Sequence, residues 1–165
     1  MPASSTFPKR VYTVNEVGKA RKLVESGYKH RVTIKGNPDF KREVKEALKH
    51  VKTARFYDFF RTYIREIVEI DGFSQLRETE AAIWVNGHLL RNSVEAAGFF
   101  VQKAFQMREF LEGKLYYGGA AEARNVDKRI EFLNALRKWS KNPTVKDKSG
   151  ELLEMWAESA SSVGP

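Results

Sequence analysis

The segment from Asn92 to Leu111 constrains the fold most, because apolar side chains surround it almost completely when it is drawn as a helix. Asn92 has capping-box spacing to Glu95, and Gly113 lies just beyond the last apolar residue, so both helix ends are marked. A helix that is apolar on most sides is buried at the centre of a domain. We therefore predict that this helix is the axis of the core. Water is expected to reach only a narrow polar stripe on it, made of Glu95, Gln102, Gln106 and Glu109.

Composition limits what surrounds that helix. The chain has 165 residues, enough for one sizeable core but few for two, and 42% of them are hydrophobic, well above the content of disordered chains. It contains no cysteine, which excludes disulfides and thiolate sites and indicates a reducing compartment. No apolar run approaches the roughly 20 residues of a membrane span, and no apolar leader follows Met1. We predict a cytoplasmic protein with no membrane partner.

The two ends of the chain are predicted to be flexible tails, at residues 1–8 and 161–165, around a single helical domain at 9–160. The first helix is expected to begin at Thr13, because Thr13 and Glu16 have the spacing of a capping box. Gly27 is placed to end it.

One strand is predicted near the N-terminus, at residues 29–35, where polar and β-branched apolar residues alternate. A strand needs a partner, and three are open: residues 9–13, residues 81–86, or the same strand of a second subunit. We favour residues 9–13. Asn37 and Pro38 then have the residue types that cap and begin a helix, predicted to run to Lys52.

Further helices are predicted from apolar periodicity at about residues 55–70, 120–141 and 149–160. Residues 73–86 are compatible with a helix or a strand. We interpret them as a helix that Ser74 caps and Gly87 ends, because glycine-bounded helices need fewer assumptions than an unpaired strand. Together the segments predict a mainly α fold, a single domain of about six helices with a minor N-terminal β element.

The excess positive charge lies entirely in the first third of the sequence. Residues 1–55 contain 14 lysines and arginines against 5 acidic residues, whereas residues 56–165 contain 15 against 16. Charge confined to one segment favours a surface that meets phosphates or acidic protein. The alternative is that the charge only serves solubility.

A basic surface is predicted from the spacing of these cations. At helical periodicity one flank of the helix at 38–52 carries Lys41, Arg42, Lys45, Lys49 and Lys52, and the preceding strand carries three more cations. Cations spaced along rigid elements bind phosphates, and nearby Tyr28 and Tyr57 are candidates for stacking on bases. The predicted nucleic-acid contacts are Lys29, Arg31, Lys35, Arg42, Lys45, Lys49 and Lys52.

No motif predicts catalysis, a cofactor or a metal site. The three histidines, His30, His50 and His88, lie far apart and outside any metal-binding spacing. The chain has neither a serine in a nucleophile-elbow motif nor a glycine-rich phosphate loop.

Three functions remain open. The first is a non-enzymatic nucleic-acid-associated protein that contacts DNA, RNA or an acidic protein through residues 29–52. The alternative is a helical protein-interaction or homo-oligomeric module, motivated by the apolar helices and the unpaired strand. A third is a hydrolase-type enzyme in which Glu66, Glu78 or Glu80 acts as general base.

Overall fold

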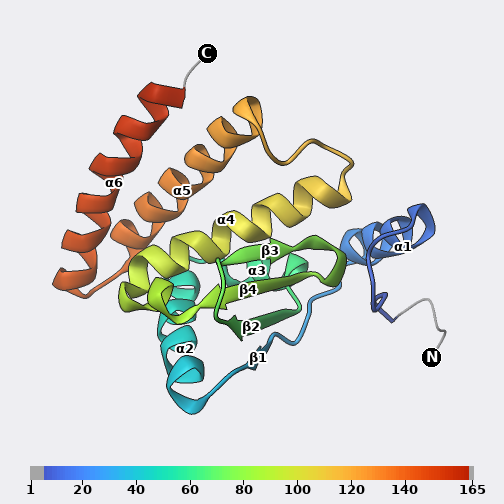
Figure 1. Ribbon diagram of the computed structural model, residues 1–165. Helices are drawn as coiled ribbons and strands as arrows, with labels where there is room; N and C mark the ends of the chain where they lie inside the picture. Colours follow the sequence, from blue (N-terminus) through green and yellow to red (C-terminus); the bar gives the residue numbers. More distant parts are fainter. Residues whose placement is uncertain (1–5, 164–165) are drawn as a thin grey trace.

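The computed structural model describes residues 6–163. They form six α-helices, a four-stranded sheet and two short 3-10 helices, so the mainly helical class with a minor β element is confirmed. The bounds are α1 Val14–Glu25, β1 Thr33–Lys35, α2 Pro38–Thr53, α3 Tyr57–Tyr63, β2 Glu66–Ile70, β3 Gln75–Arg77, η2 Glu78–Glu80, β4 Ala82–Asn86, η3 Gly87–Arg91, α4 Ser93–Leu111, α5 Gly119–Trp139 and α6 Pro143–Val163 (Figure 1). Within residues 6–163 no helix combines the length and apolar character needed to cross a membrane.

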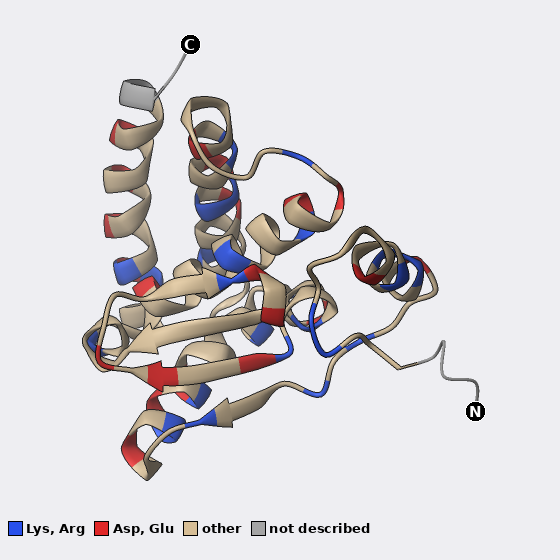
Figure 2. Ribbon diagram, turned by 45° about the vertical axis from the view of Figure 1, so that its right-hand side comes forward, with Lys and Arg blue, Asp and Glu red and all other residues tan. Residues whose placement is uncertain are grey.

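The sheet has the strand order β1-β2-β4-β3, in which β1, β2 and β4 are parallel and β3 is antiparallel. Ile34, Ile67 and Ile83 lie side by side in register, and the helices cover this face. The opposite face carries the half-buried Val68 and Trp84 and lies in front of the helices in Figure 2. The sheet thus has one covered face and one open face.

The predicted helix at 55–70 is wrong in its second half. The helix ends at Tyr63, Ile64 is already extended, and Glu66–Ile70 is strand β2. A short run such as Ile67-Val68-Glu69-Ile70 satisfies both helical and strand periodicity, and its β-branched residues favour the strand once partners flank it. The partners are β1 on one side and β4 on the other.

The predicted helix at 73–86 is also wrong. The segment forms β3, η2 and β4. The Ser74 hydroxyl accepts a hydrogen bond from the Asn86 backbone N–H at 2.8 Å instead of capping a helix. The Asn86 side-chain amide donates to the carbonyls of Asp71 and Gly72, both at 2.9 Å. These contacts close the turn between β2 and β3 against the end of β4.

The strand at the N-terminus exists but pairs with none of the three expected partners. It spans Thr33–Lys35 and pairs with β2, which had been predicted helical. Residues 9–13 lie elsewhere, where the Val11 backbone N–H donates to the carbonyl of Thr79 at 2.7 Å. Because β1 has a partner in its own chain, it gives no reason to expect a second subunit.

Local end signals were the most dependable part of the prediction. The Thr13–Glu16 capping box forms both of its hydrogen bonds, and Asn37 caps α2. The last helix begins at Pro143, earlier than predicted, because the Asn142 side chain caps it. At the chain ends, Phe7 is buried although it lies in a predicted tail, and residues 161–163 continue α6.

Helix α4 is the central element, as predicted, and Phe100, Val101 and Met107 on it are fully buried. Its polar stripe is only partly open to water, however, because Glu95, Gln102 and Glu109 bind side chains of α5. Arg129 of α5 donates to Glu95 at 2.6 Å and to Gln102 at 2.8 Å. Polar residues along one helix do not indicate whether their side chains contact water or the polar groups of a neighbouring helix.

Candidate functional site

The five cations on one flank of α2 are called here the α2 cation row: Lys41, Arg42, Lys45, Lys49 and Lys52. All five are exposed. The side chains of Lys41 and Lys45 have no ion-pair or hydrogen-bond partner among residues 6–163, and the two residues lie one turn apart, about 6 Å along the axis. Arg42 pairs with Asp39 at 2.9 Å and Lys49 with Glu46 at 3.0 Å. Exposed pairs of this kind are weak, so they leave both cations available to a phosphate.

Lys52 ends the row beside an aromatic ring. Its ammonium lies 4.6 Å from the centroid of Tyr57, and the guanidinium of Arg61 lies 5.9 Å from the same ring. The positive charge of α2 therefore continues onto α3. The ring of Tyr57 is half-buried and already in contact with Lys52, so it offers less surface to a base than the sequence suggested. Tyr28 is stacked on Phe7 at 5.8 Å.

The strand cations are not part of the same row. Lys35 pairs with Glu66 of β2 at 2.8 Å, and in the sheet register it lies beside Val68 on the open face. Helix α2 packs on the other side, with its apolar face in the core. Arg31 is exposed, and the ammonium of Lys29 donates to the Gly27 carbonyl at 3.5 Å. The seven predicted contacts thus divide into a helix group and a strand group.

The three histidines occupy separate places. His30 is buried, its Nε2 has no partner among the described residues, and burial lowers its pKa from 6.5 to about 4, with the Arg65 charge acting in the same direction. His50 Nε2 lies 2.9 Å from Ser93 Oγ. His88 is exposed. No group of three or more metal-ligating side chains occurs within residues 6–163.

The three carboxylates considered as general bases of a hydrolase, Glu66, Glu78 and Glu80, each contact a neighbouring side chain. Glu66 pairs with Lys35, and Glu80 lies 3.5 Å from Arg77. Glu78 accepts a hydrogen bond from Tyr116 and, after burial, is a cause of the raised pKa of that phenol. The three carboxylates line none of the cavities described below.

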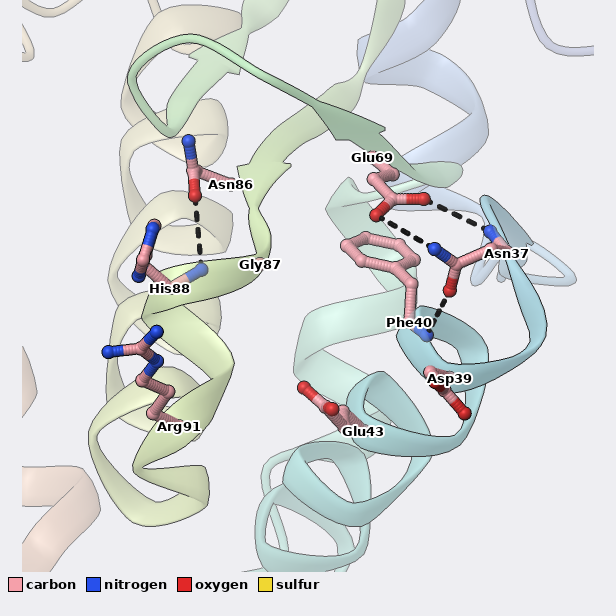
Figure 3. A pocket seen from close by; sticks show the side chains of 9 residues that line it. All are labelled: Asn37, Asp39, Phe40, Glu43, Glu69, Asn86, Gly87, His88 and Arg91. Carbon is pink, nitrogen blue, oxygen red and sulfur yellow. Dashed lines mark hydrogen bonds between the residues drawn. The ribbon is translucent and has the colours of Figure 1, made fainter.

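A cleft of about 340 Å³ lies beyond the carboxyl ends of β2 and β4, between the start of α2 and η3 (Figure 3). This is the edge where open sheets with parallel strands bind ligands. Glu43 on α2 and Arg91 on η3 stand on opposite walls. At the top, the Glu69 carboxylate accepts hydrogen bonds from the Asn37 backbone N–H at 3.0 Å and from its side-chain amide at 3.4 Å. The Glu69 carboxylate is therefore already bound to α2.

Sequence reasoning found the α2 cation row but missed this cleft and the contact between His50 and Ser93. The cleft depends on β2 and β4, which were predicted as helices. His50 and Ser93 lie 43 residues apart and carry no local motif. Comparison with known proteins finds no family model, no curated protein and no solved structure that matches the chain.

Proposed function

We propose that this protein associates with nucleic acid and that the α2 cation row contacts the phosphate backbone. The observation that carries the proposal is the pair Lys41 and Lys45, which are exposed, unpaired among the described residues and one helical turn apart. The net charge of +8 supports it, because long-range attraction brings a polyanion to the surface.

The support for α2 is rigid. Its opposite face places Phe40, Val44 and Val51 in the core, so the row keeps its spacing without a partner. On a rigid element, cations that bind phosphates lose side-chain freedom but no backbone freedom. Lysine is a point charge that carries no planar fork of donors, so four lysines and one arginine favour backbone contact over base reading. The proposed association is therefore insensitive to sequence.

The test is fluorescence anisotropy of the full chain with labelled single-stranded DNA, duplex DNA and RNA at several salt concentrations. The proposal expects log affinity to fall linearly with log salt at a slope of about 3 to 5, one unit for each neutralised phosphate. Poly-L-glutamate serves as competitor and separates an acidic-protein partner from nucleic acid. No binding at low salt, or tighter binding to polyglutamate than to every oligonucleotide, would contradict the proposal.

A further inference from the structure

Ser93 and His50 form a side-chain pair that the proposed function does not use. Ser93 is the first residue of α4, and His50 lies on α2 with its Nε2 at 2.9 Å from Ser93 Oγ. The N-cap of α4 is Asn92, whose side chain accepts from the Glu95 backbone N–H at 3.1 Å. Because Asn92 caps the helix, the Ser93 hydroxyl is left for the imidazole.

Ser93 also lines a cavity of about 430 Å³ between the start of α4 and the start of α6. The cavity is lined by Arg91, Asn92, Ser93, Val94, Thr144, Val145 and Lys148. His50 is not among these lining residues. Ser93 therefore both lines the cavity and contacts the imidazole, as a nucleophile that serves a base and a bound substrate must.

The surroundings of His50 favour the neutral form of its imidazole. Burial lowers the pKa of His50 below its usual value, Glu46 partly offsets this effect, and Lys49 adds to it. A neutral imidazole whose Nδ1 carries the proton offers Nε2 as acceptor to the Ser93 hydroxyl. The first turn of α4 also has backbone N–H groups without helical partners, and Asn92 occupies only that of Glu95. Such groups stabilise a negative oxygen that develops beside Ser93.

We propose that Ser93 is a nucleophile that accepts acyl groups from carboxylic esters bound in this cavity, with His50 as its general base. Ser93 Oγ forms a bond to the ester carbonyl carbon while its proton moves to His50 Nε2. The bond from that carbon to the leaving oxygen then breaks, and Nε2 returns the proton to the departing alcohol. Water attacks the acyl-serine in the same way, which releases the acid and restores the Ser93 hydroxyl.

The lining of the cavity indicates which esters fit. Val94 and Val145 supply apolar contact, whereas Arg91 and Lys148 are both cationic and no acidic side chain lines the cavity among the described residues. An acyl group that ends in a carboxylate satisfies both features. We therefore expect the adipate monoester of 4-nitrophenol, whose chain is too long for its own carboxylate to displace the phenolate readily, to react with Ser93 faster than 4-nitrophenyl acetate does.

The first test incubates the full chain with both esters and locates acylation by peptide mass spectrometry. Acylation at Ser93 is expected, with an initial release of one 4-nitrophenolate per chain, and Ser93→Ala should abolish it. His50→Gln should slow it by about 100-fold, the contribution of a general base. Ser26→Ala, which removes a hydroxyl that donates to the Leu23 carbonyl on α1 and does not line the cavity, should leave the rate unchanged.

A second test does not depend on ester affinity. The chain has no cysteine, so Ser93→Cys and Thr144→Cys each give a protein with a single thiol. With His50 as base, the Ser93→Cys thiol should react with iodoacetamide at pH 7 about 10-fold faster than the Thr144→Cys thiol, and adding His50→Gln should remove the difference.

Circular dichroism melting of each variant shows whether it is folded. The proposal is overturned if Ser93 is not acylated, if acylation is indifferent to His50→Gln, or if the two thiols react alike. Because α2 cation row variants do not enter these assays, the outcome is independent of nucleic-acid binding.

Discussion

The Glu109 carboxylate of α4 accepts a hydrogen bond from Arg124 of α5 at 2.6 Å, and the carboxylate is almost completely buried while the guanidinium is partly exposed. Together with Arg129, this pair attaches α5 to α4 through charged groups rather than through apolar contact alone. Breaking a buried pair leaves a charge without compensation, which is more destabilising than loss of an exposed pair.

Arg124→Ala should therefore lower the free energy of unfolding by about 2 kcal/mol, less than for a fully buried pair because Arg124 is partly exposed. Urea denaturation measures this change in the free energy of unfolding. The control is Glu46→Ala, which removes an exposed pair with Lys49 on α2 and should change stability far less. Equal effects of the two substitutions on the free energy of unfolding would contradict the claim that the buried pair contributes more than an exposed one.

Gly98→Ala should destabilise the protein although alanine favours helices. An added Cβ would lie 3.2 Å from both Cδ and Nη1 of Arg129. Arg129 is nearly immobile, because Glu95 and Gln102 bind it and its guanidinium lies 4.6 Å from the Trp156 ring centroid. We expect a loss of about 1 to 2 kcal/mol, the magnitude of overpacking.

The control for that substitution is Gly18→Ala on α1, where nothing lies within 4 Å of the added Cβ. It should stabilise the protein by about 0.5 to 1 kcal/mol through helix propensity and the unfolded chain. Thermal melting of both variants measures the difference. Stabilisation by both would show that Arg129 moves freely.

Acid should destabilise the protein through His30. Because its folded-state pKa of about 4 lies below the unfolded value of 6.5, protons bind the unfolded chain more readily. The folded state therefore has its full stability with respect to His30 above pH 6.5, where the imidazole is neutral in both states. It loses this stability as the pH falls towards 4. Between pH 7 and 4.5 the wild type should lose about 2 kcal/mol more than His30→Gln, measured by urea denaturation. Parallel loss in the two proteins would show that His30 does not titrate in this window.

Signals within a few residues of one another were readable from the sequence. Thr13 with Glu16, Asn37 with Pro38, and Asn92 mark helix ends by contacts that close within one turn, whereas the Ser74 hydroxyl, interpreted as a helix cap, binds the Asn86 N–H of strand β4 instead. The apolar arc of α4 likewise identified the centre of the core, since only burial accommodates it.

The pairing of strands that are distant in the chain could not be predicted from the sequence. Residues 66–70 and 82–86 satisfy both periodicities, and only their mutual register makes them strands. The same limit applies to the sites. The α2 cation row could be predicted from helical spacing alone. Lys35 lies apart from that row because it pairs with Glu66 of β2. Ser93 contacts His50 only because α2 packs on α4.

The most direct test of the proposed association compares two charge reversals of equal size by fluorescence anisotropy with a labelled single-stranded RNA. Lys41→Glu with Lys45→Glu alters the α2 cation row, and Lys19→Glu with Lys22→Glu alters exposed lysines on α1, far from α2 in Figure 1. The account predicts that the first pair weakens binding at least about 10-fold and lowers the salt slope by about 2, while the second leaves affinity within about 3-fold. Equal weakening by both pairs would mean that net charge alone attracts the nucleic acid, and no weakening by the first would contradict the account.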